Sequence, residues 1–192
     1  MLRWTTLVLA LLAVSATPAA AEPVALPSTQ VQVPVPLLQG GQAAPAALTL
    51  LGNGVVEELN RVRAARGLRP LRATASLVAS ARRHSAQMGA HGFFAHESAD
   101  GTPFWRRIER FYGGNGFRSW EVGENIFWQS PAGIAAVSVV RSWLASPGHR
   151  ANVLSRAWRD VGVGAVTRPS APGVYGGAAV TIVTVDFGKR RR

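Results

Sequence analysis

The chain has 192 residues, of which 47% are hydrophobic and none is cysteine, and its formal net charge is +11 at pH 7. This length and composition predict one globular domain, and they exclude a disulfide-stapled scaffold and thiol catalysis. The positive charge, nearly all of it arginine, favours an anionic partner such as lipid headgroups or cell-envelope polymers over nucleic acid. A surface that arginine only solubilises is an equal alternative.

The first 21 residues have the pattern of a secretory signal peptide. Arg3 precedes an apolar run over residues 7–14, and the stretch ends in three alanines, with cleavage expected after Ala21. The apolar run is shorter than the roughly 20 residues that span a bilayer, and no second apolar run is long enough to anchor the mature chain. We therefore expect a secreted protein, extracellular or periplasmic, with no integral membrane segment in the mature chain.

Residues 22–50 differ in composition from the later part of the chain, because they carry one charged residue and five prolines. Proline interrupts both helices and sheet ladders, so this segment is predicted to be an extended linker. The domain is predicted over residues 51–188. The final Lys-Arg-Arg-Arg, residues 189–192, is predicted to be a solvated basic tail.

Four helices are expected in the domain from the spacing of apolar residues and from helix start and stop signals. In chain order they cover residues 53–67; a stretch from Thr74 to the glycines at 89 and 92; residues 101–112, with Thr102 as N-cap and Pro103 at the first helical position; and a stretch from Ser130 and Pro131 to Leu144.

Three strands are expected, rich in β-branched and aromatic residues: residues 120–128, 160–167 and 178–188. The last two flank the turn-rich residues 168–177 and are predicted to pair as a hairpin. The order of helices, strand, helix and hairpin indicates an α+β fold, in which helices cover a small antiparallel sheet.

The chain contains four histidines, and two of them have simple structural interpretations. His84 lies on the same helical face as Leu77 and Met88, which predicts packing at the edge of the core. His91 lies at a glycine-flanked helix end, where an imidazole can meet free carbonyl groups. We expect neither to be a ligand.

His96 and His149 each come directly after a break in regular structure, and Glu124 lies among apolar neighbours in the strand Val-Gly-Glu-Asn-Ile. A carboxylate there is costly unless it is paired or hydrogen-bonded. The three residues are candidates for a His₂Glu site that holds a divalent metal such as zinc, or for a hydrogen-bonded cluster without metal. Neither a serine-hydrolase elbow nor a P-loop occurs, so the sequence identifies no nucleophile.

Five stretches, in order, resemble one family. They are LNRVRAARGLRPL, LVASARRHSAQMGAHGFFAH, GENIF, SWLASPGHRANVL and DVGVGA. These stretches, from about Asn53 to Gly188, resemble the CAP superfamily of cysteine-rich secretory, antigen 5 and pathogenesis-related proteins, and in particular its cysteine-free bacterial branch of SCP-like extracellular proteins.

The resemblance implies a three-layer α-β-α sandwich with a cleft lined by histidines and acidic residues. By motif, His96, Glu124 and His149 match the family's cleft cluster, which can hold a divalent metal, often zinc. Asn125 and Ser146 are expected to line the same ligand cleft. Ser146 stands where many eukaryotic members carry a second glutamate, so the site retains one carboxylate and is expected to hold a cation less tightly.

Members of this family are linked to sterol and lipid binding, protein binding and protease-like activity. We favour a secreted binding module whose cleft takes a small, lipidic or cell-envelope ligand, with or without a metal. One alternative is a hydrolase in which His96 or His149 is the general base and Glu124 orients it. Another is a structural or interaction protein in which the cluster only stabilises the fold.

Overall fold

The computed structural model describes residues 45–130 and 133–192. In chain order their elements are α1 Pro45–Ala64, β1 Arg72–Ala73, α2 Ala75–His91, α3 Phe104–Glu109, β2 Ser119–Gln129, α4 Ala136–Ala145, α5 Pro147–Leu154, β3 Asp160–Arg168, the 3-10 helix η1 Gly173–Tyr175 and β4 Val180–Arg191. None of the helices among these residues is long and apolar enough to cross a membrane.

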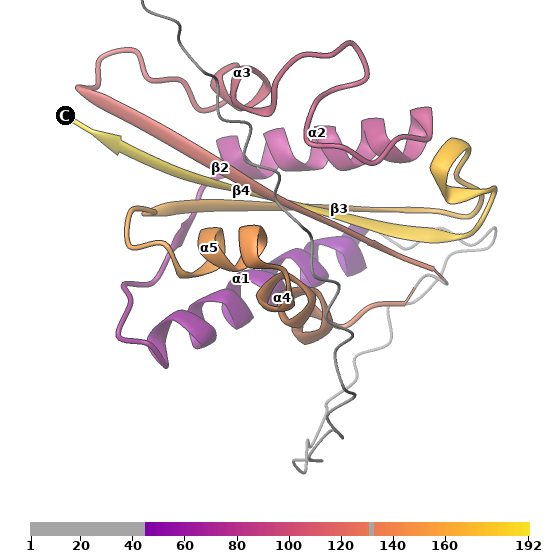
Figure 1. Ribbon diagram of the computed structural model, residues 1–192, viewed down its shortest axis with the longest axis horizontal. Coiled ribbons are helices and arrows are strands. Elements are labelled where there is room, and N and C mark those ends of the chain that lie inside the picture. The colour runs from indigo at the N-terminus through magenta and orange to yellow at the C-terminus, as the bar shows by residue number, and fades with distance from the viewer. Residues whose placement is uncertain (1–44, 131–132) are drawn as a thin grey trace, which may run out of the picture. The chain divides into compact units, whose positions relative to one another are not determined.

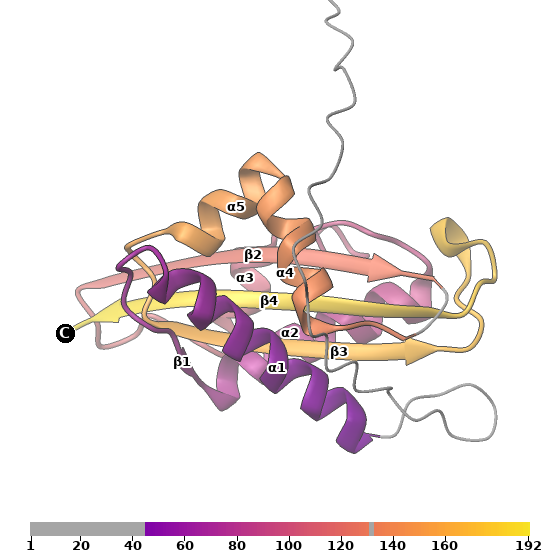
Figure 2. The same ribbon diagram turned by 90° about the horizontal axis from the view of Figure 1, so that it is seen from below.

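The described residues form three layers. Helices α2 and α3 cover one face of the sheet, and α1, α4 and α5 cover the other (Figures 1 and 2). The strand order is β1-β3-β4-β2, with β4 antiparallel to both β3 and β2. The predicted α+β sandwich and the β3–β4 hairpin are therefore confirmed, and the two-residue strand β1, parallel to β3, is an addition to the antiparallel sheet.

Each face of the sheet has its own apolar core. On the face covered by α1, α4 and α5, the largest cluster includes Leu59, Trp143 and Val163. On the other face, Met88 and Ile182 belong to one cluster, and Leu77 and Tyr112 to another. Alternate side chains of the same strands fill the two cores, because successive residues of a strand point to opposite faces.

Helix α1 begins earlier than the sequence predicted. It starts at Pro45, inside the segment predicted as a linker to residue 50. Ala47 and Leu51 are buried and extend the apolar stripe of Val55 and Leu59 backwards in helical steps. Proline suits the first turn of a helix, whose N–H groups have no intrahelical partner. The predicted signal peptide and residues 22–44 lie outside the described residues.

Two predicted helix starts differ from the structure. Thr102 belongs to a turn, in which its N–H group bonds to the Asp100 carboxylate at 2.9 Å, and Pro103 is the residue before α3. Helix α4 starts at Ala136 and not at Ser130. Ile134, which precedes the helix, is already packed in the core, and the helix begins only after it.

Three of the four residues predicted as a solvated basic tail belong to strand β4, and Arg191 and Arg192 are exposed to solvent. Strand β4 continues to Arg191, which pairs with Ser119 of β2. Lys189 lies opposite Glu121, and its ammonium group is 2.5 Å from that carboxylate. This cross-strand ion pair helps the ladder to continue through a run of like charges.

Candidate functional site

Glu124 is the centre of a buried polar cluster at the edge strand β2. Its carbonyl oxygen accepts a hydrogen bond from the Asn152 side chain at 3.1 Å, on the outer side of the sheet. Its partner in the ladder with β4 is Asp186. Because the Glu124 carbonyl points away from β4, this is a non-hydrogen-bonded pair, the type in which facing side chains lie closest. Two carboxyl groups therefore share one face of the sheet.

Both oxygens of the Glu124 carboxylate are engaged. Oε1 accepts a hydrogen bond from His96 Nδ1 at 2.8 Å, and Oε2 is paired with the guanidinium of Arg107. The Arg107 side chain, 3% exposed, also donates to the backbone oxygen of His96 at 2.9 Å. Arg107 on α3 thus neutralises the carboxylate and fixes the loop that carries His96.

His84 lies beneath this pair and is fully buried. Its Nε2 donates to the Ala95 carbonyl at 2.9 Å and is 3.9 Å from Glu124 Oε1. Burial lowers its pKa to about 4, although the negative charge of Glu124 opposes the shift. The neutral ring then leaves its Nδ1 without a hydrogen-bond partner among the described residues.

Asp186 is fully buried on β4, and its carboxyl oxygens have no hydrogen bond of normal geometry in the described residues. Burial and the neighbouring Glu124 carboxylate raise its pKa well above the usual range. Burial therefore favours the protonated, neutral form of Asp186. The buried part of the cluster then carries one balanced charge pair, between Glu124 and Arg107.

His96 and His149 form the outer part of the cluster. Their ring centroids are 6.1 Å apart with an angle of 59° between the planes, and the His96 side chain is 40% exposed. In the neutral tautomer whose Nδ1–H donates to Glu124, the lone pair of the His96 ring is on Nε2. Burial, with a smaller contribution from His96, lowers the pKa of His149. The sequence prediction that Glu124, His96 and His149 converge is supported by these distances.

Asparagine side chains position His149. Asn125 points to the face opposite Glu124, where it donates to the His149 carbonyl at 3.0 Å and accepts from Asn152 at 2.9 Å. The Asn152 side-chain amide also donates to the Glu124 carbonyl, so this one residue of α5 anchors the helix to β2. Asn125 is fully buried and holds α5, whereas the sequence analysis placed it in the ligand cleft.

The bend between α4 and α5 consists of Ser146. Pro147 starts α5 directly after it, so the Ser-Pro-Gly segment both ends one helix and begins the next. Within the described residues the Ser146 side chain forms no hydrogen bond with His96 or Glu124. His149 reaches the cluster because α5 begins at this bend.

The residues present do not fit a three-ligand zinc site in this arrangement. Zinc would need a free carboxylate oxygen, and Arg107 and His96 occupy both oxygens of Glu124. The guanidinium also repels a divalent cation. Within residues 45–130 and 133–192, no group of three or more His, Cys, Asp or Glu side chains has the geometry to hold a metal.

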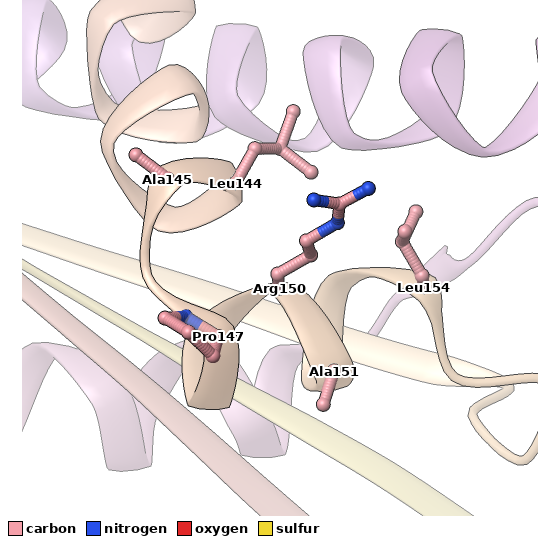
Figure 3. A pocket seen from close by; sticks show the side chains of 6 residues that line it. All are labelled: Leu144, Ala145, Pro147, Arg150, Ala151 and Leu154. Carbon is pink, nitrogen blue, oxygen red and sulfur yellow. The ribbon is translucent and has the colours of Figure 1, made fainter. Parts of the chain in front are cut away.

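A pocket of about 370 Å³ lies at the bend between α4 and α5 (Figure 3). It is lined by Leu144, Ala145, Pro147, Arg150, Ala151 and Leu154. A smaller pocket of about 90 Å³ lies between α1, α2 and β3. Neither is lined by His96, Glu124 or His149, so a ligand cleft at the two imidazoles stays a prediction.

Residues 56–187 match the cysteine-rich secretory protein (CAP) family, which is more than half of the chain. This chain belongs to the CAP family. YkwD of Bacillus subtilis, described as uncharacterized, is 34% identical over 125 residues, which cover 65% of this chain and 46% of YkwD.

Solved structures of bacterial CAP and surface proteins share the fold. An extracellular protein with an SCP domain from Bacillus anthracis is 27% identical, with a TM-score of 0.55 over 78% of this chain and 44% of that one. An outer surface protein of Borrelia burgdorferi is 19% identical, with a TM-score of 0.56 over 78% of this chain and 98% of that one. The chain thus spans less than half the length of YkwD and of the B. anthracis protein.

Three members of the buried polar cluster around Glu124 were not identified from the sequence: His84, Arg107 and Asp186. His84 was interpreted as a core-edge residue, and it is indeed buried, but it also faces Glu124. Asp186 had a usable signal, because it stands inside the apolar run Val-Thr-Val-Asp-Phe, where an acid needs a partner. Arg107 had none, since its helix carries arginine at adjacent positions.

Proposed function

We propose that this CAP protein is a secreted binding module in which His96 and His149 recognise a small, lipidic or cell-envelope ligand. The observation that carries this proposal is the hydrogen bond from His96 Nδ1 to the buried Glu124. This bond fixes the ring and its neutral tautomer. His96 Nε2 is then left to accept a hydrogen bond from a ligand, beside the half-buried His149. A ligand hydroxyl or amide N–H group suits these acceptors.

Secretion is supported by the signal-like residues 1–21 and by the B. anthracis protein, which is described as extracellular. We expect protein recovered from the medium or periplasm to begin at Glu22. Its intact mass tests this directly, and a mass that retains residues 1–21 in that fraction would contradict it.

Ligand binding is tested by native mass spectrometry of protein purified from its own secretion medium. We expect a bound small molecule or lipid in the wild type, and its loss in His96→Ala and in His149→Ala. His91→Ala is the matched control, because His91 is an exposed histidine outside the cluster. If both cluster variants keep the ligand and lose only thermal stability, the cluster is structural and the proposal fails.

One observation favours a hydrolase as the second candidate. A histidine that donates Nδ1–H to a buried carboxylate and presents Nε2 outwards has the orientation of a general base. Water would then be the nucleophile. Turnover of a peptide or ester panel should disappear in Glu124→Gln and persist in His91→Ala. Turnover that survives in Glu124→Gln would exclude this mechanism.

Zinc binding is a separate property to test, because the two imidazoles can still act as metal ligands even though both Glu124 oxygens are engaged. We expect weak uptake that depends on His96 and His149 and not on Glu124. Calorimetric titration of the wild type and of Glu124→Gln with zinc measures this. Tight stoichiometric binding that Glu124→Gln abolishes would show that Glu124 leaves Arg107 to become a ligand.

A further inference from the structure

The end of the sheet where β2 begins and β4 ends carries a concentration of positive charge. The start of β2 and the C-terminal end of β4 lie side by side in both views (Figures 1 and 2). Trp120 pairs with Arg190 and Ser119 with Arg191, and the Arg118 N–H group donates to the Arg191 carbonyl at 2.7 Å. Arg118 and Arg192 are the residues directly outside β2 and β4, so both lie at this end of the sheet.

Arg190 and Arg192 lie on the same side of the strands, because the guanidinium groups of both contact the Phe117 ring, and Arg118 is the residue directly after Phe117. We call these three residues, Arg118, Arg190 and Arg192, the arginine patch. That side is the one covered by α3, since Trp120 packs there with Tyr112. None of the three forms an ion pair with a carboxylate among the described residues.

Aromatic rings hold these cations in place. The Arg190 guanidinium carbon lies 3.9 Å from the Tyr112 ring centroid and 4.8 Å from that of Phe117. The Arg192 guanidinium carbon lies 6.0 Å from the same Phe117 ring. Cation–π contacts orient a guanidinium without neutralising its charge. The patch is thus an ordered set of cations around one half-buried ring.

The opposite face of the same strands is different. There Lys189 meets Glu121 at 2.5 Å, so that charge is compensated within the fold. Arg118 and Arg192 are both exposed. Positive charge without an ion pair among the described residues therefore gathers at this end of the sheet, from the arginine patch and from the exposed Arg191 beside Lys189.

We propose that the arginine patch binds an anionic membrane surface through lipid phosphate groups. The guanidinium fork matches phosphate oxygens, and basic groups at a surface are attracted to anionic lipids. Phe117 contacts both Arg190 and Arg192. An aromatic ring among the cations favours a lipid bilayer, which has apolar chains below its charged headgroups, over a purely polyanionic polymer. This patch is separate from the imidazole site, and binding here does not depend on the function proposed for His96 and His149.

The test is flotation of the full chain with phosphatidylcholine vesicles that contain or lack phosphatidylglycerol. We expect binding only to the anionic vesicles. Each arginine at an anionic surface is worth roughly five-fold in affinity, so Arg118→Gln with Arg192→Gln should weaken binding by roughly 30-fold. Both side chains are exposed, so the double variant should fold normally, which circular dichroism checks.

The matched control is Arg69→Gln with Arg141→Gln, which removes the same charge from two exposed positions, one in the loop after α1 and one on α4. We expect the control to keep most of the vesicle affinity, and His91→Ala to keep all of it. Equal losses in both double variants would mean that net charge alone drives binding. Binding to soluble polyphosphate without binding to vesicles would mean that the partner is a polymer. Either result overturns the proposal.

Discussion

Arg107 is the residue on which the buried cluster depends. It neutralises Glu124 and also donates to the His96 carbonyl, from a side chain that is almost inaccessible to water. Removing one partner of a buried ion pair leaves the other charge uncompensated, which costs about 3–5 kcal/mol. We expect Arg107→Met to reduce the free energy of unfolding by that amount in urea denaturation.

The neighbouring Arg106 provides the control for this prediction. It is exposed on the same helix and stacks on Trp105 with its guanidinium carbon 5.0 Å from the ring. Arg106→Met removes the same charge and should change the stability by about 1 kcal/mol or less. Similar losses in the two variants would show that α3, and not the ion pair, is the sensitive feature.

His84 predicts a pH dependence of stability. Its pKa is about 4 in the folded chain and about 6.5 in the unfolded chain. Between these values the unfolded chain binds a proton that the folded ring does not, so folding stability rises with pH. On acidification from pH 6.5 to pH 4, the wild type should lose about 3 kcal/mol more than His84→Gln.

The difference between the two pH profiles is the quantity to measure, because Asp186 contributes with the opposite sign. Its raised pKa keeps a proton in the folded chain that the unfolded chain releases, so that contribution falls as the pH rises above the unfolded value. Chemical denaturation at pH steps across this window separates the two effects. Parallel profiles for the wild type and His84→Gln would refute the prediction for His84.

At the residue scale, the sequence analysis found the part of the site that carries local signals. Histidines after breaks and an acid inside a strand are unusual enough to notice, and His96, His149 and Glu124 do come together. Arg107 and Asp186 join them only through α3 packing and the β2–β4 register. These are long-range relations that no local pattern contains.

At the element scale, glycine decides how closely α2 approaches β3. A Cβ atom on Gly164 would lie 2.0 Å from the backbone nitrogen of Arg82, which no side-chain rotation can relieve. We expect Gly164→Ala to reduce the free energy of unfolding by about 3 kcal/mol or more, because helix and strand must move apart. Thermal unfolding monitored by circular dichroism measures this.

Gly148 in α5 is the matched position. A Cβ there meets nothing within 4 Å, and alanine is the better helix former. Gly148→Ala should therefore stabilise the protein by roughly 0.5–1 kcal/mol. If Gly164→Ala were as stable as the wild type, the close contact of α2 with β3 would be wrong.

Most elements were predictable because their signals are periodic. The stripe of Val55, Leu59 and Val62 marks α1, and alternating β-branched residues mark β3 and β4. Helix α5 was not predicted because Ser146, Pro147 and Gly148 have the composition of a turn that ends a helix. The same Ser-Pro pair is also a helix start, since proline fits the first turn, and only packing against β2 distinguishes the two.

At the scale of the whole molecule, one sheet supports both helical layers. Val183 and Val185 of β4 pack in the core under α1, α4 and α5, whereas Ile182 packs in the core under α2. Neither layer can bury its apolar face without the shared strands. This arrangement implies that both layers unfold together, as a single cooperative unit without disulfides.

A pair of core substitutions on opposite faces tests this cooperativity. Val139→Ala, on the buried side of α4, should cost about 2 kcal/mol, and Ile182→Val, on β4 beneath α2, about 1 kcal/mol. The double variant should lose the sum within about 0.5 kcal/mol, because the sheet separates the two sites. Within each of the four proteins, tryptophan fluorescence and far-ultraviolet circular dichroism should report the same urea midpoint as each other. Tryptophans report on both faces, with Trp120 on one and Trp143 on the other, so a layer that melts alone would separate the two midpoints.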